Sequence, residues 1–125
     1  MKYDNLQRGN AAENLALDFL ANQGLMLVTR NFLSRAGEID LIVKNATTLV
    51  FVEVRFRRDI SRGTGAETIT HQKMTKIVQT ARYFLQNNPH YDNLDYRFDV
   101  VSVSAAIDWI QNAFTLDDIL NKDSR

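Results

Sequence analysis

Residues 37–57 read GEIDLIVKNATTLVFVEVRFR and contain two apolar runs separated by a short polar stretch. The runs GEIDLIV and LVFVEVRF are rich in Ile, Leu, Val and Phe and are too short for typical helices, so both are predicted to be strands. The polar residues 44–48 between them predict a turn. The segment as a whole is therefore expected to form a β-hairpin.

This hairpin is expected to carry two acidic residues on one face, because side chains alternate across a strand. A four-residue loop at 45–48 places Asp40 opposite Glu53, and a two-residue loop places Glu38 opposite Glu53 with Asp40 diagonal to it. Both registers keep the acids together, whereas a three-residue loop without a bulge would separate them.

The two acids on one face of the hairpin are expected to bind a cation, because their carboxylates repel each other. With Cβ atoms roughly 5 Å apart, they repel by about 3 kcal/mol at an effective dielectric near 20. Mg²⁺ or Mn²⁺ is the natural partner, since Mg²⁺ binds through one or two carboxylates and keeps water and phosphate oxygens in its other positions. Arg55 shares a face with Glu53 and adds a fixed positive charge where a phosphoryl group would bind.

The arrangement resembles the restriction-endonuclease-like nuclease superfamily, whose signature is an Asp on one strand and then Glu or Asp, any residue and Lys on the next. Here these positions are Asp40, Glu53, Val54 and Arg55. The segments GEIDLI, FVEVRFR and RFDVV, with AAE on a preceding helix, are similar to the YraN-type bacterial family, which is assigned to that superfamily by resemblance. The similarity covers residues 9–114.

Two positions depart from the superfamily pattern. Ile39 stands where the superfamily often has Pro, and Arg55 stands where it usually has Lys. The second departure bears on catalysis, because an Arg cannot lose its proton to activate water.

Two helical residues are further candidates for the site. In the helix expected over residues 4–22, Glu13 lies at the edge of the apolar stripe, and the resemblance implies a role as third metal ligand; the alternative is a partly exposed surface Glu. Lys73 lies on the flank of a second helix, expected to begin after Thr68 or Thr70 and to end near Asn87. It either supplies the amine that Arg55 lacks or covers apolar surface with its stem. The predicted stripe of the first helix comprises Ala11, Ala12, Leu15, Ala16, Phe19 and Leu20.

Charge is balanced over the whole chain but concentrated locally. The net charge is zero, yet residues 55–76 hold six Lys or Arg against two acids, a balance of +4 that leaves −4 elsewhere. A basic segment beside an acidic site is the layout expected of a nuclease; the alternative is a solvated charged loop. The predicted nucleic-acid contacts are Arg57, Arg58, Arg62 and Lys73.

The remaining patterns predict one α/β domain over residues 1–125. Further strands are expected at 25–32, 96–102 and 106–114, with a helical turn at 115–120, which gives a restriction-endonuclease-like fold: a mixed, curved sheet of about five strands flanked by helices. Asp99 is interpreted as a half-buried structural acid paired with Arg97 or Arg82. The chain has no Cys and no apolar run long enough for a membrane span or secretory signal, so a cytoplasmic protein without a membrane partner is expected, with a homodimer left open.

Together these features predict a Mg²⁺-dependent (or Mn²⁺-dependent) endonuclease that hydrolyses phosphodiester bonds in DNA or RNA. Asp40, Glu53 and Glu13 are the predicted metal ligands, and Arg55 is the electrostatic partner of the transition state. One alternative is a nuclease-like module that binds nucleic acid but cuts slowly or not at all. Another is an interaction domain in which the acids simply face water.

Overall fold

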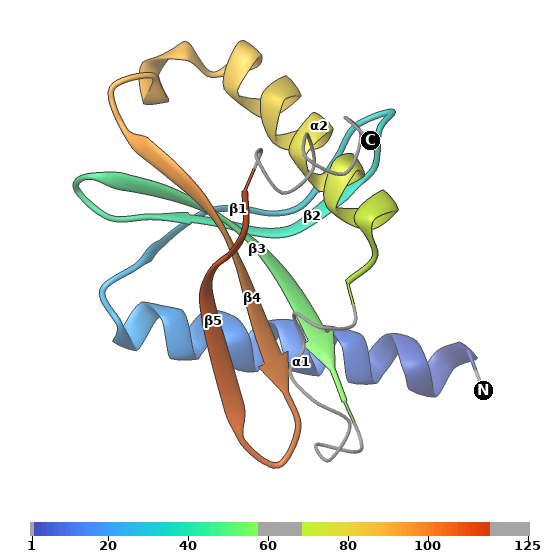
Figure 1. The fold of residues 1–125 in the computed structure, drawn as a ribbon. Helices are drawn as coiled ribbons and strands as arrows, with labels where there is room; N and C mark the ends of the chain where they lie inside the picture. Colours follow the sequence, from blue (N-terminus) through green and yellow to red (C-terminus); the bar gives the residue numbers. More distant parts are fainter. Residues whose placement is uncertain (1, 58–68, 116–125) are drawn as a thin grey trace.

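The computed structural model describes residues 2–57 and 69–115, with the side chains of the first helix described from residue 10 onward. Figure 1 shows the elements in the predicted order. They are α1 (Lys2–Asn22), β1 (Met26–Leu33), β2 (Glu38–Lys44), β3 (Thr48–Phe56), α2 (His71–Asn87), the 3₁₀ turn η3 (Pro89–Tyr91), β4 (Asp95–Val103) and β5 (Ile107–Phe114). The predicted α/β fold is confirmed. Residues 58–68 of the basic segment and all but the first residue of the turn predicted at 115–120 lie outside the described residues.

The sheet is mixed, with strand order β1-β2-β3-β4-β5. Neighbouring strands are antiparallel except β3 and β4, which run parallel. Parallel neighbours require a crossover connection, and α2 lies in that connection. As a result α2 covers one face of the sheet and α1 covers the other (Figure 1).

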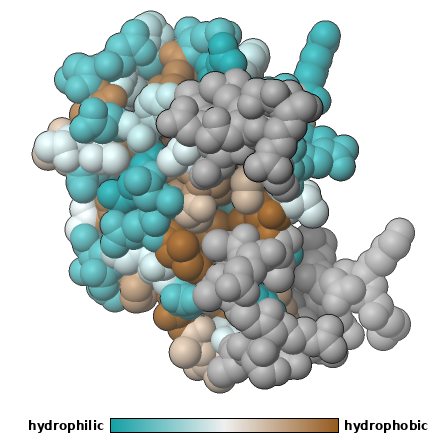
Figure 2. Space-filling view, viewed as in Figure 1, coloured by the Kyte–Doolittle hydropathy of each residue, from teal (hydrophilic) through white to brown (hydrophobic). Residues whose placement is uncertain are grey.

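Each face of the sheet has its own apolar core, which explains why the strands read as nearly continuous apolar runs. On the α1 face the buried residues include Ala12, Ala16, Leu20, Leu41, Val43, Val50 and Val52. On the α2 face they include Ile42, Leu49, Phe51, Ile77, Val78, Ala81, Phe84 and Phe98. Figure 2 shows that the hydrophobic surface in its view is concentrated at the centre, over the strands, with hydrophilic side chains to its left.

The buried stripe of α1 differs from the predicted one. Ala12, Ala16 and Leu20 are buried, but Ala11 is exposed and Leu15 is 51% exposed. The three buried residues all belong to the predicted stripe, so periodicity gave its centre correctly and made it too wide. The small side chains of Ala12 and Ala16 allow the helix axis to lie close to the sheet along this line of contact.

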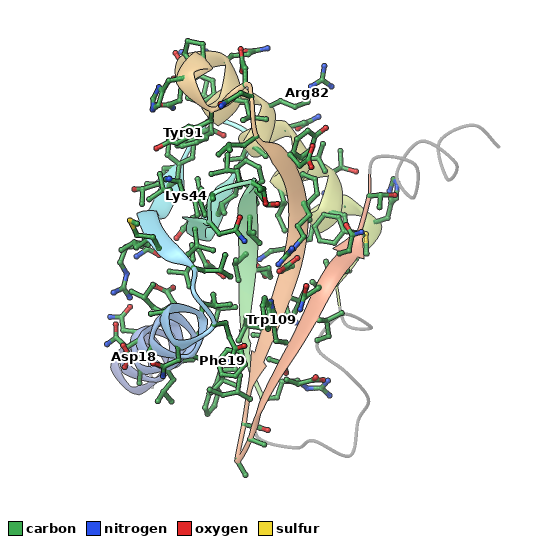
Figure 3. All side chains as sticks on the ribbon, turned by 90° about the vertical axis from the view of Figure 1, so that its left-hand side faces the viewer. Asp18, Phe19, Lys44, Arg82, Tyr91 and Trp109 are labelled. Atoms are coloured by element: carbon green, nitrogen blue, oxygen red, sulfur yellow. The ribbon has the colours of Figure 1, made fainter. Side chains whose placement is uncertain are left out.

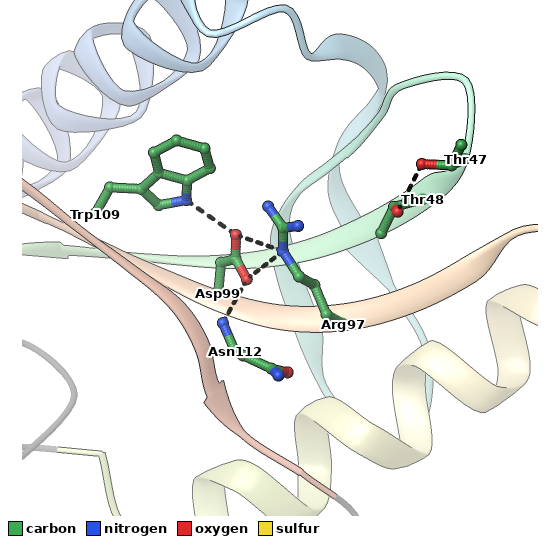
Figure 4. A network of polar contacts seen from close by, with 6 residues as sticks. All are labelled: Thr47, Thr48, Arg97, Asp99, Trp109 and Asn112. Atoms are coloured by element: carbon green, nitrogen blue, oxygen red, sulfur yellow. Dashed lines mark hydrogen bonds and ion pairs between the residues drawn. The ribbon is translucent and has the colours of Figure 1, made fainter.

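Asp99 is a structural residue, and it is more deeply buried than predicted. Its side chain has 0% exposure and accepts hydrogen bonds from Arg97 Nε at 3.0 and 3.2 Å, from Trp109 Nε1 at 2.9 Å and from the Asn112 backbone N–H at 2.9 Å (Figure 4). The Trp109 ring also meets Phe19 of α1 edge-on at 5.8 Å (Figure 3). The predicted pairing with Arg97 is confirmed, and the network ties β4 and β5 together beneath α1.

Candidate active site

The β2–β3 hairpin has the register of a four-residue loop. Lys44 pairs with Leu49, and the pairing runs without a shift to Leu41 opposite Val52. Continuing it by one residue places Asp40 opposite Glu53, as the first of the predicted registers requires. Both acids are therefore on the face that α2 covers.

Asp40 is held beside Glu53 in a largely buried position. Its Oδ2 accepts a hydrogen bond from the Val54 backbone N–H at 2.8 Å. The pKa of Asp40 is raised from 3.8 to about 8. Burial is the largest cause, and the charge of Glu53, a hydrogen bond shared with Glu53 and the charge of Glu13 add to the rise. The hydrogen bond from the Val54 N–H lowers the pKa but does not offset these effects. At neutral pH and without a cation, the pair therefore holds a proton.

Two cations from different elements converge on Glu53, whose side chain is only 4% exposed. Lys73 Nζ lies 3.1 Å from Glu53 Oε2, and Arg55 Nη1 lies 3.7 Å from the same oxygen. Lys73 reaches it from the first turn of α2, which Thr70 caps by accepting a 3.1 Å hydrogen bond from the Lys73 N–H. Of the two interpretations of Lys73, the structure favours the one in which its amine approaches the sheet.

A pocket of about 260 Å³ opens between β2 and the start of α2, beside the carboxylate pair. It is lined by Gly37, Glu38, Asp40, Lys73, Lys76 and Ile77. The turn before β2 is fixed to α2 through Thr80, which is fully buried and lies 3.1 Å from Ser34 Oγ. The polar lining of this pocket therefore combines two lysines, Lys73 and Lys76, with two acids, Glu38 and Asp40.

Glu13 lies near the site but has other partners. Its Oε1 is 3.3 Å from Arg30 Nη2, and its side chain is 14% exposed. Across the described residues, 2–57 and 69–115, no three His, Asp or Glu side chains are close enough to hold a metal together. Glu13 influences Asp40 through its charge, and its role as a direct ligand stays a prediction.

The basic segment is only partly described. Arg57 extends β3, with its backbone N–H donating to Val103 O at 2.8 Å, while Arg58 and Arg62 lie outside the described residues. The contact of these arginines with nucleic acid stays a prediction.

No helix in the described part of the chain is both long and apolar enough to cross a membrane. The cytoplasmic location stays a prediction.

Two residues near the acid pair, Lys76 and Asn31, were not among the predicted site residues. Lys76 lines the pocket one helical turn after Lys73, and that spacing was a usable signal. Asn31 lies on β1 between Arg30 and Phe32, which pair with Leu41 and Ile39 and so place it opposite Asp40. No local pattern marked Asn31, because its position depends on the pairing of β1 with β2.

Comparisons with known proteins place the chain among close relatives. The model of the family described as "Uncharacterised protein family UPF0102" matches residues 12–103. A UPF0102 protein of Saccharophagus degradans is 47% identical over 113 residues, covering 90% of this chain and 96% of that protein. A UPF0102 protein of Vibrio campbellii is 47% identical over 113 residues, and one of Pseudomonas fluorescens is 41% identical over 112 residues. Each of these two matches covers 87% of this chain and 93% of the matched protein. These matches confirm the predicted YraN-type resemblance, and the protein belongs to the UPF0102 family.

Proposed function

We propose that the protein is a Mg²⁺-dependent or Mn²⁺-dependent endonuclease that hydrolyses phosphodiester bonds in DNA or RNA. The observation that carries the proposal is the buried Asp40–Glu53 pair with Lys73 Nζ at 3.1 Å from Glu53 Oε2. The motif resemblance to the restriction-endonuclease-like superfamily points in the same direction.

The donor set suits a hard divalent cation. Asp40 and Glu53 offer only oxygen atoms, on adjacent strands that fix their separation. The raised pKa of Asp40 reflects, besides burial, repulsion that a cation would relieve in place of the proton. When bound, the ion would polarise the phosphate and lower the pKa of a bound water.

The chain's own cations have separate tasks in this proposal. Arg55 keeps its charge at every relevant pH and stabilises negative charge developing on the phosphate. Lys73, as a primary amine on a helix, donates hydrogen bonds to a phosphate oxygen or exchanges a proton with the attacking water. Lys76, which also lines the pocket, contacts a neighbouring phosphate.

The test is metal-dependent cleavage of single-stranded, duplex and branched DNA and RNA. Wild type is compared with Glu53→Gln, which removes one ligand charge, and with Asp18→Asn, an equivalent change at an exposed position of α1 (Figure 3). We expect cleavage by wild type and Asp18→Asn that requires Mg²⁺ or Mn²⁺, and none by Glu53→Gln. Cleavage that persists in Glu53→Gln would place the activity elsewhere or in a contaminant.

A nucleic-acid-binding module is the second candidate, and Arg55 in place of the usual Lys is the feature that favours it. It predicts binding without cleavage for all variants, with affinity that falls steeply as salt rises. Fluorescence anisotropy at several salt concentrations, run beside the cleavage assay, separates it from the enzyme. Neither binding nor cleavage would favour an interaction domain in which the acids have no nucleic-acid role.

A further inference from the structure

Asn31 has an unusual backbone conformation for a residue inside a strand. Its φ is 54°, and among the described residues only Asn112, with φ of 53°, is another non-glycine residue with positive φ. This left-handed region is disfavoured for residues with a side chain, although Asn tolerates it better than most. The pairs Arg30 with Leu41 and Phe32 with Ile39 place Asn31 opposite Asp40.

The side chain of Asn31 bridges two acids from different elements. With the amide oriented to satisfy its neighbours, the Asn31 nitrogen lies 2.9 Å from Glu38 Oε1 and 3.2 and 3.3 Å from the two carboxylate oxygens of Glu13. Arg30, the preceding residue, also contacts Glu13, with its Nη2 at 3.3 Å from Oε1, and donates to Asn14 Oδ1 at 3.0 Å. Glu13 belongs to α1 and Glu38 to β2, so one amide joins the helix and the hairpin next to Asp40.

This bridge opposes the natural tendency of the two glutamates. Like charges at short range repel, and Glu38 is exposed, so without the Asn31 amide the Glu38 side chain would turn toward water. The amide donates to both carboxylates, and it holds Glu38 at the pocket that Glu38 and Asp40 line.

We propose that Asn31 is a positioning residue, whose amide fixes Glu13 and Glu38 beside the Asp40–Glu53 pair and so raises the affinity of the site for a divalent cation. The inference rests on the proposed metal site. It differs from a purely backbone role, in which Asn31 is present only because Asn tolerates a left-handed conformation. Glycine separates the two roles, since it accepts that conformation freely and has no amide side chain.

The experiment compares Mn²⁺ binding to wild type, Asn31→Gly and Asn112→Gly by isothermal titration calorimetry. Asn112→Gly is the matched control, because Asn112 is the other left-handed asparagine and contacts the Asp99 network through its backbone. We expect all three metal-free proteins to melt within about 3 °C of one another. Asn31→Gly should bind Mn²⁺ at least about tenfold more weakly than wild type, the scale on which outer partners of metal ligands act, and Asn112→Gly should match wild type.

A double-mutant cycle with Glu13→Gln tests the route of the effect. If Asn31 acts partly through Glu13, the double variant should bind Mn²⁺ more tightly than the product of the two single effects predicts. Wild-type affinity in Asn31→Gly would overturn the positioning role and leave the proposed function standing. A wild type that does not bind millimolar Mn²⁺ would overturn the metal site itself, and the positioning role with it.

Discussion

Replacing Asp40 with Asn should stabilise the metal-free protein, and the gain should grow as the pH rises. Asn has nearly the shape of Asp, so its oxygen can still accept the hydrogen bond from the Val54 N–H. Its amide can donate to Glu53, which replaces the proton that the acid pair otherwise shares.

The magnitude follows from the pKa of Asp40, which is raised from 3.8 to about 8. Native Asp40 keeps its proton up to about pH 8, whereas the unfolded chain releases it near pH 4, so the native state binds more protons between these values. Wild-type stability therefore falls as pH rises through this window. At about 1.4 kcal/mol per pH unit, the upper bound over the window is about 6 kcal/mol, and the Asn variant does not incur this loss.

The assay is urea unfolding followed by the fluorescence of Trp109, the only tryptophan, in EDTA at pH 5, 6, 7 and 8. Groups common to both proteins cancel in the difference, so we expect Asp40→Asn to gain on wild type steadily and to lead by about 2 kcal/mol or more at pH 8. Asp18→Asn should follow the wild-type curve. Parallel curves for wild type and Asp40→Asn, or a less stable Asn variant at pH 8, would refute the account of the carboxylate pair.

Three further predictions test the neighbouring groups. Lys73→Met should reduce metal-dependent cleavage by about 10² or more. Lys76→Met should weaken substrate binding and leave kcat within about tenfold, since one lost phosphate contact alters binding more than chemistry. Equal losses of cleavage in both variants would mean that the two lysines do not have separate roles. Arg55→Ala should lose about 10² in cleavage and Arg55→Lys should stay within about tenfold of wild type; a clear increase in Arg55→Lys would mean that Lys73 does not supply the required amine. Arg97→Met should destabilise the protein by about 3 kcal/mol in urea unfolding, because it leaves the buried Asp99 without its cation. The variant should keep the Mn²⁺ affinity of wild type. A loss of Mn²⁺ binding in Arg97→Met would mean that the Asp99 network also supports the metal site.

Local sequence was sufficient to predict the hairpin and the acid pair. Period-two alternation fixes which residues share a face, and only a few loop lengths are available, so Asp40 and Glu53 could be placed together from residues 37–57 alone. The order of elements followed for the same reason, because the apolar runs that mark the helices and strands are local signals.

Long-range packing decided what the sequence could not. The rotation of α1 depends on which small residues meet the sheet, so Leu15 was wrongly placed in the buried stripe. The approach of Lys73 to Glu53 depends on where the crossover helix lies on the sheet, and the bridge made by Asn31 depends on the pairing of β1 with β2. Each of these joins residues from separate elements, and no periodicity within one element contains that information.

The contacts of Glu53 change what the Arg at position 55 means for catalysis. In a site where the strand supplies the only cation, replacing Lys by Arg removes the one group able to exchange a proton. Here Glu53 contacts a cation from the strand and another from α2, at 3.7 and 3.1 Å. Arg55 and Lys73 thus bring two positive charges to Glu53. In the proposed enzyme the Arg would supply constant charge and the helical amine would take the part of the missing strand Lys, so the choice between enzyme and binding module depends on Lys73 more than on Arg55.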